Sequence, residues 1–166
     1  MGREIERKFL VRNDGWRALA ENGVQYRQGY LSTDPERSVR VRTAGDRAFI
    51  TIKGKSSGAA RDEFEYSIPA ADARELLERL CVHPLIEKTR HIVRHAGLKW
   101  EIDEFAGANR GLIMAEVELK DADQEIAKPA WIGDEVTGDA RYYNLRLVSS
   151  PYSEWGRKGA NEWRTG

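Results

Sequence analysis

Charged residues alternate with apolar residues in seven segments of this sequence. In the first, residues 3–9, Glu4, Glu6 and Lys8 share one face of a predicted strand, because side chains alternate along a strand. The other six are residues 39–42, 50–53, 63–66, 88–90, 100–103 and 115–120. A single such face is usually the wet side of a sheet. Seven such charged faces, most of them carrying charge of one sign, instead indicate an organised charged interior.

The basic members of these segments predict a binding site for a polyphosphate. Guanidinium groups match phosphate oxygens in a bidentate manner, and lysines add point charges. A triphosphate carries about four to five negative charges, scaled from about 1.5 to 2 for one phosphomonoester. Six bases exceed what one carboxylate substrate needs. They are Lys8, Arg40, Arg42, Lys53, Lys88 and Arg90.

The acidic members predict a divalent metal ion, since they cannot contact a polyanion directly. Clustered carboxylates select hard ions such as Mg²⁺ or Mn²⁺. The inward acids are expected to be Glu4, Glu6, Glu63, Glu65, Glu101, Asp103, Glu116 and Glu118. Bases for phosphate oxygens combined with acids for metal indicate metal-assisted phosphoryl transfer. The chain has neither a Walker A nor a Rossmann glycine pattern, so the sheet itself must bind the phosphates.

The base that activates the attacking water has two kinds of candidate. Glu63 and Glu65 are carboxylates of the right type, and spacing does not choose between them. A Lys8–Tyr30 pair is the second candidate, because Tyr30 lies on the next predicted strand. The alternative for Tyr30 is an aromatic side chain packed at the wall of the sheet.

The elements that must position these residues are mainly strands. Eight are predicted, over residues 2–11, 25–33, 37–44, 47–54, 61–68, 85–95, 98–105 and 112–120. Hairpin-length links predict a mainly antiparallel sheet. Helices are expected over residues 14–21, capped by Asn13 or Asp14, and over residues 71–80, with Pro69 at the entrance. Beyond residue 121 we expect a helical turn at 123–127, a loop at 131–139 and a helix at 142–148.

Eight antiparallel strands close naturally into a barrel that can hold one small ligand. The predicted fold is therefore α+β, an eight-stranded antiparallel β-barrel, or tunnel, with a charged lumen and flanking helices. The apolar faces would point outward and be covered by helices. Their residues are Ile5, Phe9, Val39, Val41, Ile50, Ile52, Phe64, Tyr66, Ile68, Ile102, Val117 and Leu119. Burying an unpaired charge costs several kcal/mol, so such a lumen needs water, mutual pairing or a charged ligand.

Bulk composition favours one domain over residues 1–166, with residues 153–166 a mobile polar tail. The 27 basic and 27 acidic residues balance, which gives no electrostatic case for a nucleic-acid or membrane partner. Cys81 is the single cysteine and cannot form an internal disulfide, and no apolar run reaches the ~18 residues of a membrane span. A cytoplasmic location is expected.

These motifs resemble the CYTH family of triphosphate tunnel metalloenzymes. The resemblance rests on Glu4-x-Glu6-x-Lys8 and on the later charged pairs, and it spans residues 2 to about 148. It implies an eight-stranded tunnel acting on triphosphates with Mg²⁺ or Mn²⁺. It also implies that Glu4, Glu6, Glu116 and Glu118 hold metal and that the six bases grip phosphates, with Glu101 and Asp103 in support. Short bacterial-type members usually prefer inorganic triphosphate, hydrolysed to pyrophosphate and phosphate.

Other functions remain open at this point. Relatives in the family hydrolyse thiamine triphosphate, RNA 5′-triphosphates or nucleoside triphosphates, or cyclise ATP. A non-catalytic polyphosphate-binding module is an alternative of a different class. Such a module would be expected to lose its acids first, yet acidic pairs persist at both ends of the predicted sheet. An active enzyme, as a monomer or a homodimer, is therefore the favoured interpretation.

Overall fold

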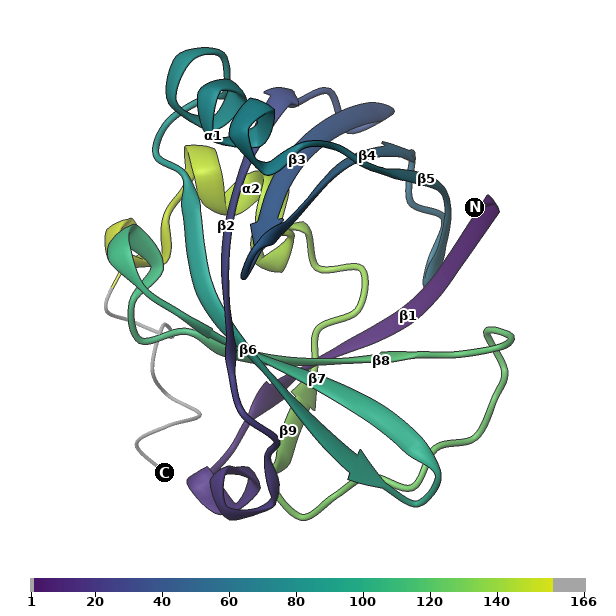
Figure 1. Ribbon diagram of the computed structural model, residues 1–166. Coiled ribbons are helices and arrows are strands. Elements are labelled where there is room, and N and C mark those ends of the chain that lie inside the picture. Colours follow the sequence, from purple (N-terminus) through teal and green to yellow (C-terminus); the bar gives the residue numbers. More distant parts are fainter. Residues whose placement is uncertain (1, 157–166) are drawn as a thin grey trace.

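The computed structural model describes residues 2–156, and its strands close into an antiparallel barrel (Figure 1). The strands of the barrel wall follow the order β5-β4-β3-β2-β6-β7-β8-β1, and pairing of β5 with β1 completes the ring. They are β1 (Gly2–Val11), β2 (Val24–Ser32), β3 (Arg37–Ala44), β4 (Arg47–Gly54), β5 (Ala60–Ser67), β6 (Ile86–His95), β7 (Leu98–Phe105) and β8 (Ile113–Glu118). The predicted eight-stranded barrel is confirmed.

A ninth strand was not predicted. Residues 131–139 were expected to be a loop, but β9 (Ile132–Glu135) pairs with β1. β1 therefore pairs with β8 along one edge and with β5 and then β9 along the other. Four residues are too few to show an alternation in the sequence, and the strand forms because the end of β1 offers a free edge.

The helix predicted over residues 71–80 is present, whereas the other helical predictions are only partly met. Residues 14–21 form only a 3₁₀-helix, η1 (Asp14–Leu19), with the Asn13 side chain accepting from Gly15 N at 2.9 Å. α1 (Ala70–Arg79) follows Pro69 as predicted. The helical turn expected at 123–127 is wrong, since residues 124–129 have no regular structure. The expected helix at 142–148 divides into η3 (Ala140–Tyr142) and α2 (Asn144–Ser149), and the remaining short turns are η2 (Gly107–Asn109) and η4 (Tyr152–Glu154).

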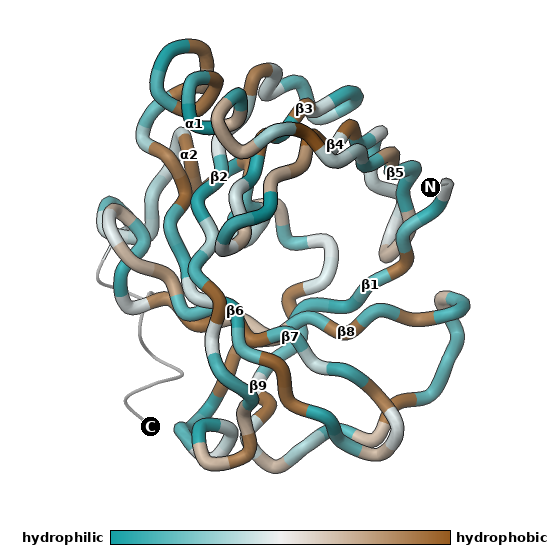
Figure 2. Tube along the Cα trace, in the orientation of Figure 1, coloured by the Kyte–Doolittle hydropathy of each residue, from teal (hydrophilic) through white to brown (hydrophobic). Residues whose placement is uncertain are grey.

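The apolar core forms three clusters, two of which lie outside the barrel wall, and brown and teal alternate along most strands in Figure 2. Phe9, Trp16 and Trp100 centre the cluster beneath η1 and β9. A second cluster lies on the inward face at one end of the barrel, where Leu10, Ile86 and Met114 pack with residues of α2, and a third lies outside the wall beneath α1. The rest of the barrel interior is left to charged residues.

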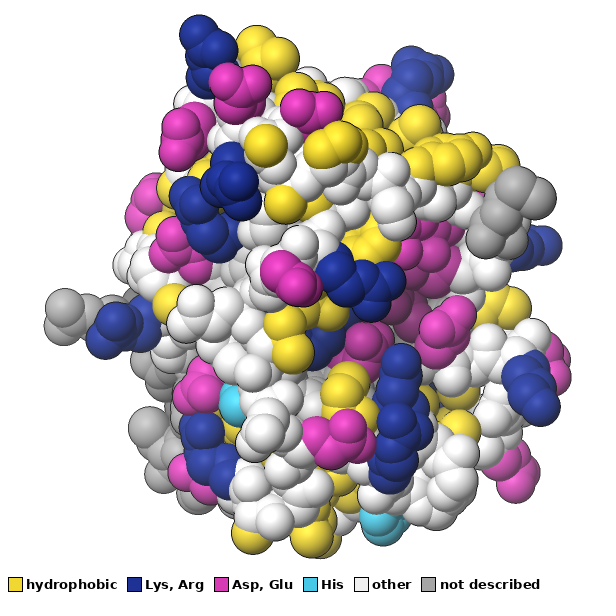
Figure 3. Space-filling model, viewed as in Figure 1, with side chains coloured by type: hydrophobic (Ala, Val, Ile, Leu, Met, Phe, Trp, Pro, Cys, Tyr) yellow, Lys and Arg dark blue, Asp and Glu magenta, His cyan; other side chains and the backbone are white. Residues whose placement is uncertain are grey.

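Part of the outer apolar face is uncovered, contrary to expectation. Ile52, Phe64 and Tyr66 are 40%, 38% and 54% exposed. α1 packs mainly on β2, β3 and β4, and the surface over β4 and β5 is yellow at the upper right of Figure 3. The coverage by helices is therefore incomplete on this side of the barrel.

The end of the described chain is packed rather than loose. Trp155 stacks edge-on against Tyr142 and Tyr152, with ring centroids 5.2 and 5.1 Å away, and its indole donates to Ser150 O at 2.9 Å. The expected mobile tail begins at residue 153, and its residues 157–166 lie outside the described residues. No helix within residues 2–156 is long and apolar enough to cross a membrane.

Candidate functional site

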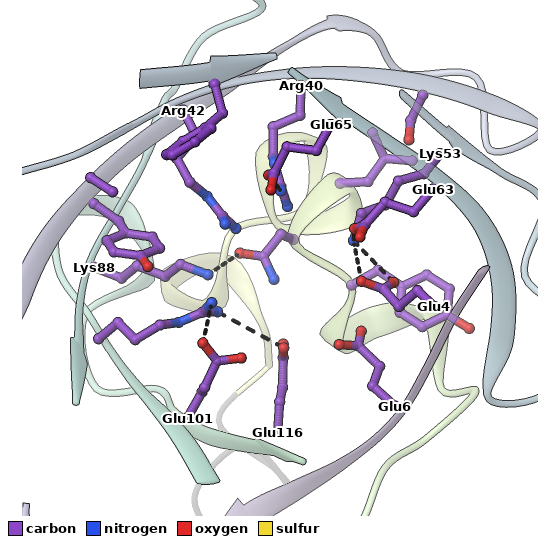
Figure 4. Close-up of a pocket in the computed structure, with 18 of the residues that line it drawn as sticks. Glu4, Glu6, Arg40, Arg42, Lys53, Glu63, Glu65, Lys88, Glu101 and Glu116 are labelled. Atoms are coloured by element: carbon purple, nitrogen blue, oxygen red, sulfur yellow. Dashed lines mark hydrogen bonds and ion pairs between the residues drawn. The ribbon is translucent and has the colours of Figure 1, made fainter. Parts of the chain in front are cut away.

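The barrel encloses a cavity of about 830 Å³ whose lining is dominated by charge (Figure 4). Of the fourteen charged residues predicted to point inward, all except Asp103 line it. Asp103 is on the same face of β7 as Glu101 but is only 1% exposed, because Lys88 and Arg90 cover it. The inward placement predicted from the period-two alternation is therefore correct, and Figure 3 shows acidic side chains within the hollow.

Two carboxylates oppose each other on β1 and β8. The register sets Glu6 opposite Glu118 and Lys8 opposite Glu116. Like charges directly opposite on a sheet are destabilising. Burial, together with the carboxylates of Glu116 and Glu4, raises the pKa of Glu6 to about 7. This part of the lumen has an excess of negative charge that a cation would relieve.

Lys8 only partly offsets that excess. Its Nζ lies 3.9 Å from Glu6 Oε1 and 3.7 Å from Glu116 Oε1. Burial alone would raise the pKa of Glu116, but Lys8 and Arg90 hold it at about 2. Lys8 is therefore a shared counter-ion for two acids on neighbouring strands.

Glu4 is the most completely paired acid of the β1 motif. Lys53 Nζ lies 3.1 and 3.2 Å from its two oxygens, and Arg61 Nε donates at 3.1 Å. Burial would raise the pKa of Glu4, but Lys53 and Arg61 help to bring it to about 2. Arg61 was not among the six predicted bases, but it also lines the cavity.

β6 and β7 carry a compact ion-pair network. Asp103 accepts from Lys88 Nζ at 2.7 Å and from Arg90 Nε and Nη2 at 2.7 and 2.8 Å. Burial would raise the pKa of Asp103, but these two cations hold it well below its usual range. Arg90 also contacts Glu101 at 3.1 Å and Glu116 at 3.8 Å. Asp103 thus anchors two phosphate-binding candidates from behind the lining.

Among the predicted bases of the lumen, the two arginines of β3 are neutralised least by carboxylates. Arg42 has no carboxylate within 4.0 Å among residues 2–156, and Arg40 has only Glu65, at 3.8 Å. Burial, with repulsion from Arg40 and Arg90, lowers the pKa of Arg42 to about 9. In the ring of strands β3 lies opposite β8, so these arginines face the acidic wall (Figure 4).

Two buried amides in the lumen wall, Gln28 and Asn144, were not among the predicted site residues. Gln28 Nε2 donates to Asn144 Oδ1 at 3.1 Å, and Lys88 Nζ donates to the same oxygen at 3.1 Å. Arg42 Nε donates to Gln28 Oε1 at 2.9 Å. Asn144 begins α2, which brings Tyr143, Asn144 and Leu145 to the cavity. An isolated Asn in a terminal helix gives no signal of this contact in the sequence.

The candidate water-activating residues fall into different surroundings. Glu63 Oε2 is 3.2 Å from Lys53 Nζ, and burial and Glu4 raise its pKa. The Glu65 side chain is 42% exposed and accepts from Thr51 Oγ1 at 3.0 Å. Lys8 and Tyr30 are not on adjacent strands, since β1 pairs only with β5, β8 and β9. Tyr30 instead lines the cavity from β2, opposite β1, and packs in the apolar cluster of α2.

The donor set suits a metal ion that also takes ligands from the substrate. Within residues 2–156, no three His, Cys, Asp or Glu side chains are grouped closely enough to form a cage by themselves. Mg²⁺ is usually bound through one or two carboxylates and substrate phosphates rather than in an all-protein cage. The opposed Glu6 and Glu118, with the raised pKa of Glu6, provide such a partial set.

An acidic wall and a basic wall across one water-accessible cavity can bind a polyanion and a cation together. Two relatives of this chain are named for an activity on a polyanion. The inorganic triphosphatase of Acetivibrio thermocellus is 51% identical over 93% of this chain and 99% of its own length. That of Nitrosomonas europaea is 39% identical over 89% of this chain and 97% of its own.

Solved structures and a family model agree with these relatives. The crystal structure of the inorganic triphosphatase NE1496 has a TM-score of 0.61 and 37% identity, and the match covers 87% of this chain and 93% of that one. The CYTH domain model matches residues 2–145. With the closed barrel and its charged lumen, this match shows that the chain belongs to the CYTH domain family.

Proposed function

We propose that this protein hydrolyses inorganic triphosphate to pyrophosphate and phosphate inside the barrel, with a divalent metal ion. The observation that carries the proposal is the division of the lumen into opposed walls. Arg40 and Arg42 are under-neutralised on β3, while Glu6 and Glu118 oppose each other across β1 and β8. The names of the two relatives, at 51% and 39% identity, support inorganic triphosphate as the substrate.

The bases are proposed to bind and orient the phosphates. Arg40 and Arg42 can accept a phosphate group without breaking a strong ion pair. Lys8, Lys53, Lys88 and Arg90 have carboxylate partners and would exchange part of that pairing for phosphate oxygens. Charge-assisted hydrogen bonds to phosphate are among the strong ones, which favours this exchange. The substrate would therefore span the lumen from the arginines of β3 towards the acids.

The acids are proposed to hold Mg²⁺ or Mn²⁺. Glu6, Glu116 and Glu118 are the candidates on the β1–β8 wall, and Glu4 joins them if Lys53 and Arg61 shift towards the substrate. When bound, the ion supplies positive charge that offsets negative charge on phosphate oxygens and makes water a better nucleophile. Glu101 and Asp103 are proposed to hold Arg90 in place rather than to bind metal.

Glu63 is the better-placed candidate for the base that takes the proton from the attacking water. It is half-buried beside Glu4 and Lys53, whereas Glu65 is more exposed beside Arg40. A raised pKa brings a carboxylate closer to the operating pH, which favours proton transfer. Lys8 and Tyr30 remain the alternative pair, facing the cavity from opposite strands.

The remaining features of the proposal concern the chain as a whole. We propose a single functional domain over residues 1–166, acting as a monomer or homodimer in the cytoplasm. No nucleic-acid or membrane partner is proposed, because bases of the lumen such as Lys53 and Lys88 are paired with acids inside the barrel.

Phosphate release tests the proposal. Inorganic triphosphate, ATP, thiamine triphosphate and pyrophosphate are each assayed with Mg²⁺, Mn²⁺ or EDTA. Glu4→Gln and Glu118→Gln remove lumen acids, and Glu78→Gln removes an exposed acid of α1 as the matched control. We expect metal-dependent release from inorganic triphosphate that both lumen variants abolish and the control retains.

Other results of these assays would indicate a different function. Pyrophosphate and a cyclic nucleotide formed from ATP would identify a cyclase, and faster release from ATP or thiamine triphosphate would identify an organic triphosphatase. Tight triphosphate binding without turnover under any metal would leave a binding module.

A further inference from the structure

Tyr26 lies among three of the cations that line the lumen. It extends from β2 into the cavity and is half-buried there. Arg42 Cζ is 4.8 Å and Arg90 Cζ 5.0 Å from its ring centroid, and Lys88 Nζ is 5.9 Å away. All three distances are within the range of a cation–π interaction. One aromatic ring therefore joins bases from β3 and β6.

These cations need such a partner because they repel one another. Arg40 and Arg90 are among the causes that lower the pKa of Arg42, after burial itself. Arg90 has Asp103 to fix its position. Arg42 has no carboxylate within 4.0 Å, and in residues 2–156 its one hydrogen bond is from Nε to Gln28. Its Nη atoms are left for a ligand.

The ring of Tyr26, rather than its hydroxyl, makes these contacts. No hydrogen bond of the hydroxyl is found within the described part of the chain, whereas its π face has a negative quadrupole that attracts cations. The same contacts occupy the ring, which leaves it poorly suited to stack on the base of a nucleotide. The position is thus built for arranging charge rather than for reading an organic group.

We propose that Tyr26 is a positioning residue that holds the guanidinium groups of Arg42 and Arg90 close together and directed at the bound triphosphate. The inference rests on the proposed function, because it takes these arginines as phosphate ligands. Without the ring, repulsion would separate the two groups, and each would have to be ordered again when the substrate binds. Substrate binding should therefore suffer more than the chemical step.

Three variants test this role with inorganic triphosphate and Mg²⁺. Tyr26→Leu removes the ring, Tyr26→Phe retains it without the hydroxyl, and Tyr66→Leu removes an exposed tyrosine on the outer face of β5. For Tyr26→Leu we expect KM to rise about 10-fold while kcat falls less than about threefold, in line with a partly desolvated cation–π contact. Tyr26→Phe and Tyr66→Leu should stay within about twofold of the unmodified protein in both constants.

Calorimetric binding of inorganic triphosphate in EDTA separates this inference from the proposed function. If the unmodified protein binds triphosphate without hydrolysing it, the proposed function fails, but Tyr26→Leu should still weaken Kd about 10-fold. The inference is overturned if Tyr26→Leu keeps the original KM and Kd, if Tyr26→Phe is as impaired as Tyr26→Leu, or if the unmodified protein does not bind triphosphate. If Tyr26→Leu does not fold, Tyr26→Met, which fills similar space without a ring, replaces it in the test.

Discussion

Replacing Asp103 with Asn should destabilise the barrel, because it removes the anion on which two buried cations depend. Asp103 is 1% exposed and accepts hydrogen bonds of 2.7, 2.7 and 2.8 Å from Lys88 and Arg90. Asn preserves the size of the side chain and removes only its charge. Breaking a buried ion pair from one side typically costs about 3–5 kcal/mol, since the other charge is left uncompensated.

The structure places the expected loss near the lower end of that range. Arg90 keeps Glu101 at 3.1 Å and Glu116 at 3.8 Å. Burial, with repulsion from Arg90 and Arg42, already lowers the pKa of Lys88 to about 7, so Lys88 can release its proton once Asp103 is neutral. We therefore expect a loss of about 3 kcal/mol at pH 7. For a chain of this size that corresponds to a fall in Tm of about 6–12 °C.

Urea unfolding followed by circular dichroism measures this loss, provided that each variant unfolds in a single transition. Asp62→Asn makes the same substitution at an exposed position of β5 and should change stability by less than about 0.5 kcal/mol. Inorganic triphosphate should restore part of the stability of Asp103→Asn, because it brings negative charge to the same cations. A loss below about 1 kcal/mol, or one equal to that of the control, would refute the assignment of Asp103 as their anchor.

Four further substitutions separate stability from activity. Glu6→Gln should be more stable than the unmodified protein at pH 8 in EDTA by up to about 3 kcal/mol, yet inactive. Folding raises the pKa of Glu6 from 4.5 to about 7. The contribution of Glu6 to the free energy of unfolding is therefore present below pH 4.5 and is lost as the pH rises through 7. Urea unfolding at pH values from about 4 to 8 measures this loss. Arg42→Ala should leave Tm unchanged or higher, since it relieves repulsion, while kcat/KM falls at least about 10-fold in phosphate-release kinetics. Glu63→Gln should lower kcat about 100-fold or more and Glu65→Gln less than about 10-fold in the same assay, and equal effects would contradict our choice of base.

The inward-facing residues could be predicted from sequence because strand geometry is local. Once residues 3–9 form a strand, Glu4, Glu6 and Lys8 must share a face, and the apolar alternate positions mark the other face as the core side. Long-range pairing could not be predicted in the same way. Lys53 meets Glu4 only because β5 closes the ring onto β1, and Asn144 meets Lys88 only because α2 packs at the barrel. Neither contact leaves a local pattern.

Coverage of the barrel was overestimated for a related reason. Alternation identifies Ile52, Phe64 and Tyr66 as outward apolar residues, but whether a helix reaches them depends on the length and direction of α1. α1 ends at Arg79, and its main contacts with strands are with β2, β3 and β4. A period-two pattern shows which face is apolar and does not say what covers it.

The pairing of charges in the lumen separates residues that support the fold from residues poised for ligands. Asp103 and Glu4 are held by two cations each, so removing either leaves buried positive charge and should cost stability. Glu6 and Arg42 face like charges, so neutralising either should relieve the folded state and impair binding. The barrel can retain such unfavourable pairs because two of its three apolar clusters lie outside the wall, away from the lumen. A metal ion between the carboxylates and a polyphosphate against the arginines would relieve both repulsions at once, so we expect each ligand to strengthen the binding of the other.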